Sequence, residues 1–244
     1  MMYSVLTSEL IKLKGSKIIY LTLLLHLITI LLIFIIYAFN PKYSITQTGW
    51  GEYYQTIYMF FNFMTGTASF YILTGYIFSR EYQEGTYLIL FTSPISKLKF
   101  YFGKLFIIFI FIVFTMIILL VLPFSLGMLI TNIPITFNVF LQQLKVVSLM
   151  TLMHFCLIPI ASFTAIKWRS FLSVVILMCL ILFLNIILVN VPGNVLYPWI
   201  VPLLFSPHEG TGRTFINYPI GTLSLFLILI LGLALSLYEY QKTK

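Results

Sequence analysis

Long apolar runs separated by short polar stretches make up most of this 244-residue chain. A helix needs about 20 apolar residues to cross the hydrocarbon core of a bilayer. Runs of that length predict six membrane spans, which cover residues Ile18–Phe39, Ile57–Ser79, Leu105–Ile130, Val146–Ile166, Phe171–Val189 and Ile220–Leu237. The pattern therefore predicts an all-α integral membrane protein, with one transmembrane domain over residues 1–244.

Three segments outside these spans have patterns of their own. Residues 1–17 begin with apolar side chains at helical spacing, so we expect an amphipathic helix that lies on the membrane surface. Residues 80–104 form the largest predicted loop on the side of the membrane where residues 1–17 lie. Residues 191–219 contain the apolar stretch Val195–Phe205, which is too short to span and predicts a re-entrant segment.

Composition and charge support this assignment and orient the chain. Hydrophobic residues make up 61% and charged residues 8%, whereas a soluble domain carries about a quarter charged residues. With the N-terminus inside, the cytoplasmic side receives Lys12, Lys14, Lys17, Arg80, Lys97, Lys99, Lys104, Lys167, Arg169, Lys242 and Lys244, and the outer side Lys42, Lys145 and Arg213. This asymmetry predicts cytoplasmic N- and C-termini. The same basic residues flank spans and form no dense run, so we expect no nucleic-acid partner.

Few residues in the predicted spans could do chemistry. The chain has no Asp, and none of its six Glu lies within a span, so the titratable candidates at depth are His26 and His154. Hydrogen-bonded packing explains these histidines more simply than a proton relay. HExxH, GxSxG and Walker A motifs are absent, and His208 with Glu209 lacks further zinc ligands. We therefore expect no catalytic residue, no metal site and no cofactor bound by this chain.

Small and polar residues gather in the second predicted span, among them Asn62, Thr65, Gly66 and Ser69. Small residues allow helices to approach closely in lipid, which favours a packing role. The same residues could line a polar path through the membrane.

The loop at residues 80–104 has the most informative local pattern. Charged residues open it, an apolar stretch follows, and Pro94 interrupts any helix. An exposed apolar cluster with Glu residues nearby is a docking feature for another protein. An ordinary loop packed against the helix bundle is the alternative.

This loop resembles that of ATP-binding-cassette permeases of the ABC-2 type. In that family E-x-x-x-G-T, an apolar stretch, P-[IL]-S/T-[RK] and then G-K follow the second of six spans. The matching residues are Glu81, Gly85, Thr86, Pro94, Ile95, Ser96, Lys97, Gly103 and Lys104. The interfacial N-terminal helix, six spans and re-entrant element before the last span also resemble the family, which implies the ABC-2 exporter fold.

The resemblance implies the permease subunit of an exporter in a bacterial plasma membrane. Such a chain pairs with a second permease, as a homodimer or heterodimer, and with cytoplasmic ATPase subunits that bind ATP and Mg²⁺. The segment from Glu81 to Thr92 would be a coupling helix seated in a groove of the ATPase, and Lys104 would anchor span three at the inner interface. The implied coupling residues are Glu81, Glu84, Gly85, Thr86, Leu88, Phe91 and Pro94.

Spans two and five commonly line the path in that family. This implication adds Asn185 to Asn62, Thr65, Gly66 and Ser69 as candidate path residues. Small permeases of this composition resemble Gram-positive systems that expel peptide antibiotics or confer immunity to bacteriocins. We therefore expect an amphipathic or hydrophobic substrate, an antimicrobial peptide or a drug.

Two other classes of function stay open at this point. A non-transporting membrane scaffold or sensor could use the same loop to dock a cytoplasmic signalling protein. An intramembrane enzyme that uses His26 or His154 ranks third.

Overall fold

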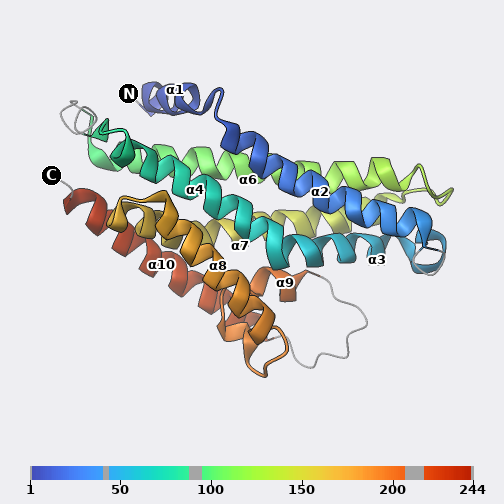
Figure 1. Ribbon diagram of the computed structural model, residues 1–244. Coiled ribbons are helices and arrows are strands. Elements are labelled where there is room, and N and C mark those ends of the chain that lie inside the picture. Colours follow the sequence, from blue (N-terminus) through green and yellow to red (C-terminus); the bar gives the residue numbers. More distant parts are fainter. Residues whose placement is uncertain (1, 41–43, 88–94, 207–216, 243–244) are drawn as a thin grey trace.

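The computed structural model describes residues 2–40, 44–87, 95–206 and 217–242, and all regular structure in these ranges is helical (Figure 1). Within them, five helices are long and apolar enough to cross a membrane: α2 (Lys17–Phe39), α6 (Lys97–Gly127), α7 (Phe137–Trp168), α8 (Phe171–Leu188) and α10 (Tyr218–Lys242). The predicted all-helical class is confirmed.

The second predicted span is helical, but it is divided into three elements. α3 (Ile45–Phe60), the π-helical turn η2 (Phe61–Thr65) and α4 (Gly66–Gln83) follow one another along the chain. None of the three has both the length and the hydropathy of a span. The predicted count of six spans therefore remains a prediction.

An amphipathic N-terminal helix is present as α1 (Met2–Leu13), and it meets α2 at a tight turn. Gly15 has a φ of +86°, a left-handed conformation that glycine adopts without steric cost. Ser16 then caps α2, because its hydroxyl accepts a hydrogen bond from the backbone N–H of Ile18.

Both termini lie at one end of the bundle, together with the end of α4 and the beginning of α6 (Figure 1). We call this the terminal end. The turn between α7 and α8 consists of Arg169, in a left-handed conformation, and Ser170, whose hydroxyl caps α8. These two helices therefore form a hairpin with almost no connecting loop.

The segment between α8 and α10 returns into the bundle. It contains the short 3-10 helix η3 (Asn194–Leu196) and α9 (Val201–Phe205), which pack against α10, α7 and η2. Val195, Ile200 and Val201 are buried. This packing is what a re-entrant segment requires, while its depth in the membrane stays a prediction.

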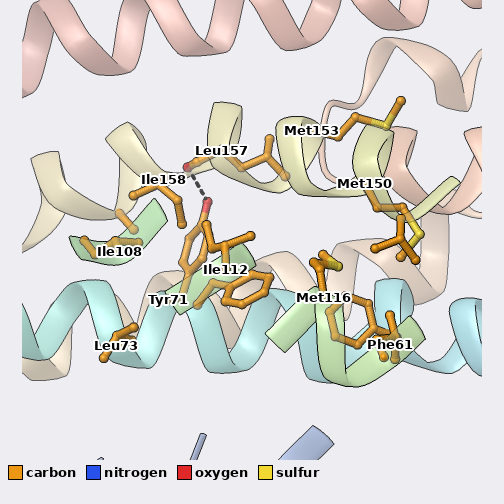
Figure 2. Packing of buried hydrophobic residues seen from close by; sticks show 14 of the residues in the cluster. Phe61, Tyr71, Leu73, Ile108, Ile112, Met116, Met150, Met153, Leu157 and Ile158 are labelled. Atoms are coloured by element: carbon orange, nitrogen blue, oxygen red, sulfur yellow. Dashed lines mark hydrogen bonds between the residues drawn. The ribbon is translucent and has the colours of Figure 1, made fainter. Parts of the chain in front are cut away.

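The core of the bundle is apolar and extends between α3, α4, α6 and α7. Figure 2 shows Tyr71 of α4 pointing towards α7, where its hydroxyl donates to the carbonyl of Leu157 at 3.2 Å. The indole N–H of Trp199 in turn donates to the Tyr71 hydroxyl at 2.6 Å. Tyr71 therefore joins three segments of the chain at a fully buried position.

Close backbone approach holds α10 against α7. A Cβ atom at Gly232 would lie 2.9 Å from Cβ of Pro159 and 3.0 Å from the backbone nitrogen of Ile160. Only glycine allows this contact without moving a helix.

We expect Gly232→Leu to lower the free energy of unfolding in detergent micelles by about 1–3 kcal/mol, because the added side chain forces α10 away from α7. Ala234→Leu is the matched control, since Ala234 is exposed on the same helix. Equal stability of the two variants would show that this contact does not hold the helices together.

Candidate coupling site

Four charged side chains from three helices form a buried ionic cluster at the terminal end. Lys104 of α6 lies 2.8 Å from a carboxylate oxygen of Glu81 on α4 and 3.0 Å from the carboxylate of Glu9 on α1. Lys12 of α1 lies 2.6 Å from Glu9 and 2.8 Å from Glu81. These residues, Glu9, Lys12, Glu81 and Lys104, are named the ionic cluster below. It contains two positive and two negative charges and is therefore neutral.

Burial makes each partner in the cluster dependent on the others. The side chain of Lys104 is 1% exposed, and its ammonium group also donates to the carbonyl of Ile77 at 3.2 Å. Burial alone would raise the pKa of Glu81, but Lys104 and Lys12 outweigh it and hold that pKa below its usual value. Burial would lower the pKa of Lys12, yet Glu81 and Glu9 raise it above its usual value. Removing one charge leaves another buried without compensation.

Arg80 connects the ionic cluster to the start of the long loop. Its guanidinium donates to the backbone carbonyl of Lys12 at 2.6 Å and to the carboxylate of Glu84 at 2.7 Å. Gly85 follows with a φ of +69°, so the chain leaves α4 through a left-handed residue. The loop therefore begins directly beside the contact between α1 and α4.

The predicted coupling residues fall into three groups. Glu81 is buried in the ionic cluster, so its carboxylate faces other helices instead of the surface. Glu84 and Gly85 are exposed, and Thr86 is partly exposed. Leu88, Phe91 and Pro94 lie outside the described residues.

Sequence reasoning missed the tertiary role of the first helix. Glu9 and Lys12 were not among the predicted coupling residues, although their spacing of three places both on one helical face. Lys104 was expected to anchor α6 at the membrane interface, but it is enclosed by protein. The signal for this site was a Lys at the start of a span, with a Glu near the end of the preceding one.

The candidate path residues lie around η2, deeper in the bundle. The side-chain oxygen of Asn62 lies 2.9 Å from Nε2 of His154, and its NH₂ group donates to the carbonyl of Pro202 at 3.3 Å. Ser69 lies 2.8 Å from Nε2 of His26. Both histidines are therefore hydrogen-bonded within the bundle, as the simpler interpretation of the sequence favoured.

Two phenylalanine rings separate the histidines. Phe61 and Phe70 each contact both imidazoles, with ring centroids 5.1–5.8 Å apart. Since Phe61 belongs to η2 and Phe70 to α4, the polar pairs and the aromatic rings fix the π turn against α2 and α7.

The remaining path candidates are also tied to the π turn. The NH₂ group of Asn185 on α8 donates to the carbonyl of Phe63 at 3.4 Å. A Cβ atom at Gly66 would lie 2.8 Å from the ring of Phe61, so this glycine serves close packing. The hydroxyl of Thr65 is buried and has no hydrogen-bond partner among the described residues. The structure thus brings the candidates together around one helical turn.

Comparison with known proteins identifies the family. The sequence profile of the ABC-2 family transporter proteins matches residues 5–203. This chain belongs to the ABC-2 transporter family. It is 22% identical over 207 residues to the bacitracin transport permease protein BCRB of Bacillus licheniformis, an alignment that covers 84% of this chain and 98% of that protein. No solved structure matches the chain.

Family membership and the apolar helices together define the coarse function. This ABC-2 protein is a multi-pass membrane subunit of an ABC transporter, a family whose permeases work with ATP-binding-cassette subunits.

We expect Lys104→Met to lower the free energy of unfolding by about 3–5 kcal/mol, because Glu9 and Glu81 then share Lys12 as their one remaining cation in the ionic cluster. Titration of the micelle-bound protein with a denaturing detergent measures this. Lys99→Met, an exposed change on the same helix, is the control. Glu81→Gln should lower the free energy of unfolding less in the Lys104→Met background than in the wild-type protein. If the effects of the two substitutions simply add, Glu81 and Lys104 are not coupled.

We expect Asn62→Leu to cost about 1–3 kcal/mol of unfolding free energy, since it removes the partner of His154 and of the Pro202 carbonyl. Asn138→Leu, at an exposed position near the start of α7, is the matched control. If the two variants unfold alike, Asn62 does not secure the segment that contains α9.

Proposed function

We propose that this protein is the permease subunit of an ABC exporter that removes an amphipathic peptide from the bacterial membrane. ATP and Mg²⁺ bind to a separate cytoplasmic ATPase subunit. The observation that supports this best is the ionic cluster, because it joins α1, α4 and α6 at the base of the loop that family resemblance assigns to the ATPase contact.

The described contacts suggest how movement would pass from the ATPase to the spans. Glu84, Gly85 and Thr86 begin the exposed part of the loop, and we assign them to the ATPase contact together with Leu88, Phe91 and Pro94. Displacement of this loop pulls on Arg80, which is bonded to both Glu84 and α1. Since Glu81 is held by Lys12 and Lys104, the three helix ends move as one body. In this proposal Glu81 transmits force inside the permease.

The route for substrate would pass close to the π turn. Asn62, Thr65, Ser69 and Asn185 offer hydrogen-bonding groups without charge, which suits a peptide with both polar and apolar surfaces. A π turn carries an extra residue in a helical turn and is frequent at functional sites. In the arrangement described here Asn62, Ser69 and Asn185 are hydrogen-bonded to other groups of the bundle, so transport requires that the helices around η2 separate.

The substrate class follows from the relative, whose name states that it transports bacitracin. We propose bacitracin or a similar amphipathic antibiotic peptide for this chain, exported with a second permease chain completing the transporter. Both termini, and therefore the ionic cluster, would face the cytoplasm.

A scaffold that docks a signalling protein through the same loop is the alternative. It would use the exposed residues after α4 but would not require that the contact change nucleotide hydrolysis. Purification of the tagged chain from its native membranes in mild detergent, with mass identification and an ATPase assay, distinguishes the two functions.

We expect Gly85→Pro to abolish peptide resistance conferred by the transporter and peptide stimulation of ATP hydrolysis, because proline cannot adopt a φ of +69°. Gly193→Pro is the control, since Gly193 has a φ of +81° at the opposite end of the bundle. Membrane abundance is measured for both. Wild-type resistance and ATPase stimulation in the Gly85 variant would argue against the proposed coupling, and a partner without nucleotide hydrolysis would favour the scaffold.

A further inference from the structure

The turn between α1 and α2 forms an apolar groove against α6. Its volume is about 370 Å³, within the range of ligand pockets. Several of its apolar lining residues are exposed on the surface of the protein, among them Leu10, Ile110 and Phe114. The apolar lining residues include Leu10, Leu13, Leu73, Ile107, Ile110 and Phe114.

Positive charge gathers at the mouth of this groove. Lys14 lines it, together with the turn residues Gly15 and Ser16. Lys17, one residue beyond that turn, lines a neighbouring hollow along α2, and Tyr20 borders both. Lys14 and Lys17 are exposed and make no ion pair in the part of the chain that the structure describes.

Among the residues that the structure describes, no acidic side chain lines either hollow. Glu9, the nearest carboxylate along the chain, and Glu81 at the same end of the bundle are already paired with lysines in the ionic cluster. The first turn of α2 adds the positive end of a helix dipole beside the two lysines. An anion at this mouth therefore meets uncompensated positive charge.

We propose that this groove binds one acyl chain of an anionic phospholipid, and that Lys14 and Lys17 bind its phosphate group. The groove follows α6 from Ile107 to Phe114, which is about 10 Å at 1.5 Å per residue. One leaflet of hydrocarbon is about 15 Å deep, so the groove fits the upper part of a chain that stands upright in its own leaflet.

The location also fits a lipid better than a soluble ligand. The lining is almost wholly apolar below the lysines, and the exposed rings of Tyr20 and Phe114 stand at its edge. The bound lipid would contact α1, α2 and α6, two of which are held by the ionic cluster. This inference does not depend on the direction of transport or on the exported substrate.

Native mass spectrometry of the full chain tests the site with two probes of equal chain length, phosphatidylglycerol and phosphatidylcholine. We expect one retained phosphatidylglycerol at concentrations where phosphatidylcholine does not bind. Lys14→Gln with Lys17→Gln should weaken phosphatidylglycerol binding by about fivefold per lysine. Lys99→Gln with Lys242→Gln removes the same charge from exposed positions at the same end of the bundle and should leave binding unchanged.

A second variant separates the groove from the charge. Ile110→Trp fills the groove from an exposed position without altering any charge, so retention of phosphatidylglycerol should fall although Lys14 and Lys17 remain. Equal retention of the two lipids would overturn the proposal. So would an equal loss of phosphatidylglycerol binding in the Lys14/Lys17 and Lys99/Lys242 double variants, which would indicate unspecific attraction. Unchanged binding in Ile110→Trp would place the lipid elsewhere.

Discussion

The desolvation of three charges at one end of the bundle, those of Lys104, Glu9 and Glu81, is the constraint on which this architecture depends. A buried ammonium such as that of Lys104 is tolerated only where carboxylates and carbonyls replace its water. Glu9 and Glu81 supply those carboxylates from two other helices, and Lys12 balances their second charge. If α1 left the bundle, Lys104 would lose one of its two carboxylate partners and Glu81 one of its two ammonium partners. The short helix α1 is thereby tied to the helices of the bundle.

The polar groups near the centre follow a different rule. Around the π turn, Asn62 pairs with His154 and Ser69 with His26, and both hydrogen bonds join different helices. Such pairs contribute modest stability in a bundle, so they can exchange partners at lower cost than the ionic cluster can. The molecule thus combines a strongly constrained end with a more adaptable centre, a division that suits the proposed separation of the helices around η2.

The all-helical class and most span positions could be read from the sequence, because long apolar runs have few other structures in lipid. The division of the second span at the π turn could not be read from the sequence, because it involves the close packing of Gly66 against the ring of Phe61. The location of the loop after α4 was predictable from Glu81 and Gly85, and the exposure of Glu84 agrees with it. The burial of Glu81 was not predictable, because its partners lie 69 and 23 residues away in sequence.

The separation of Glu9 from Lys104 also has a consequence for biogenesis. The two residues are 95 positions apart, and ribosomes add roughly 5–20 residues per second. The helix that emerges first therefore waits about 5–20 s before its last ionic partner exists. During that interval Glu9 has Lys12 as its neighbour and water or lipid headgroups around it. Because α1 precedes α6 along the chain, the ion pair between Glu9 and Lys104 can form only after α6 has been made.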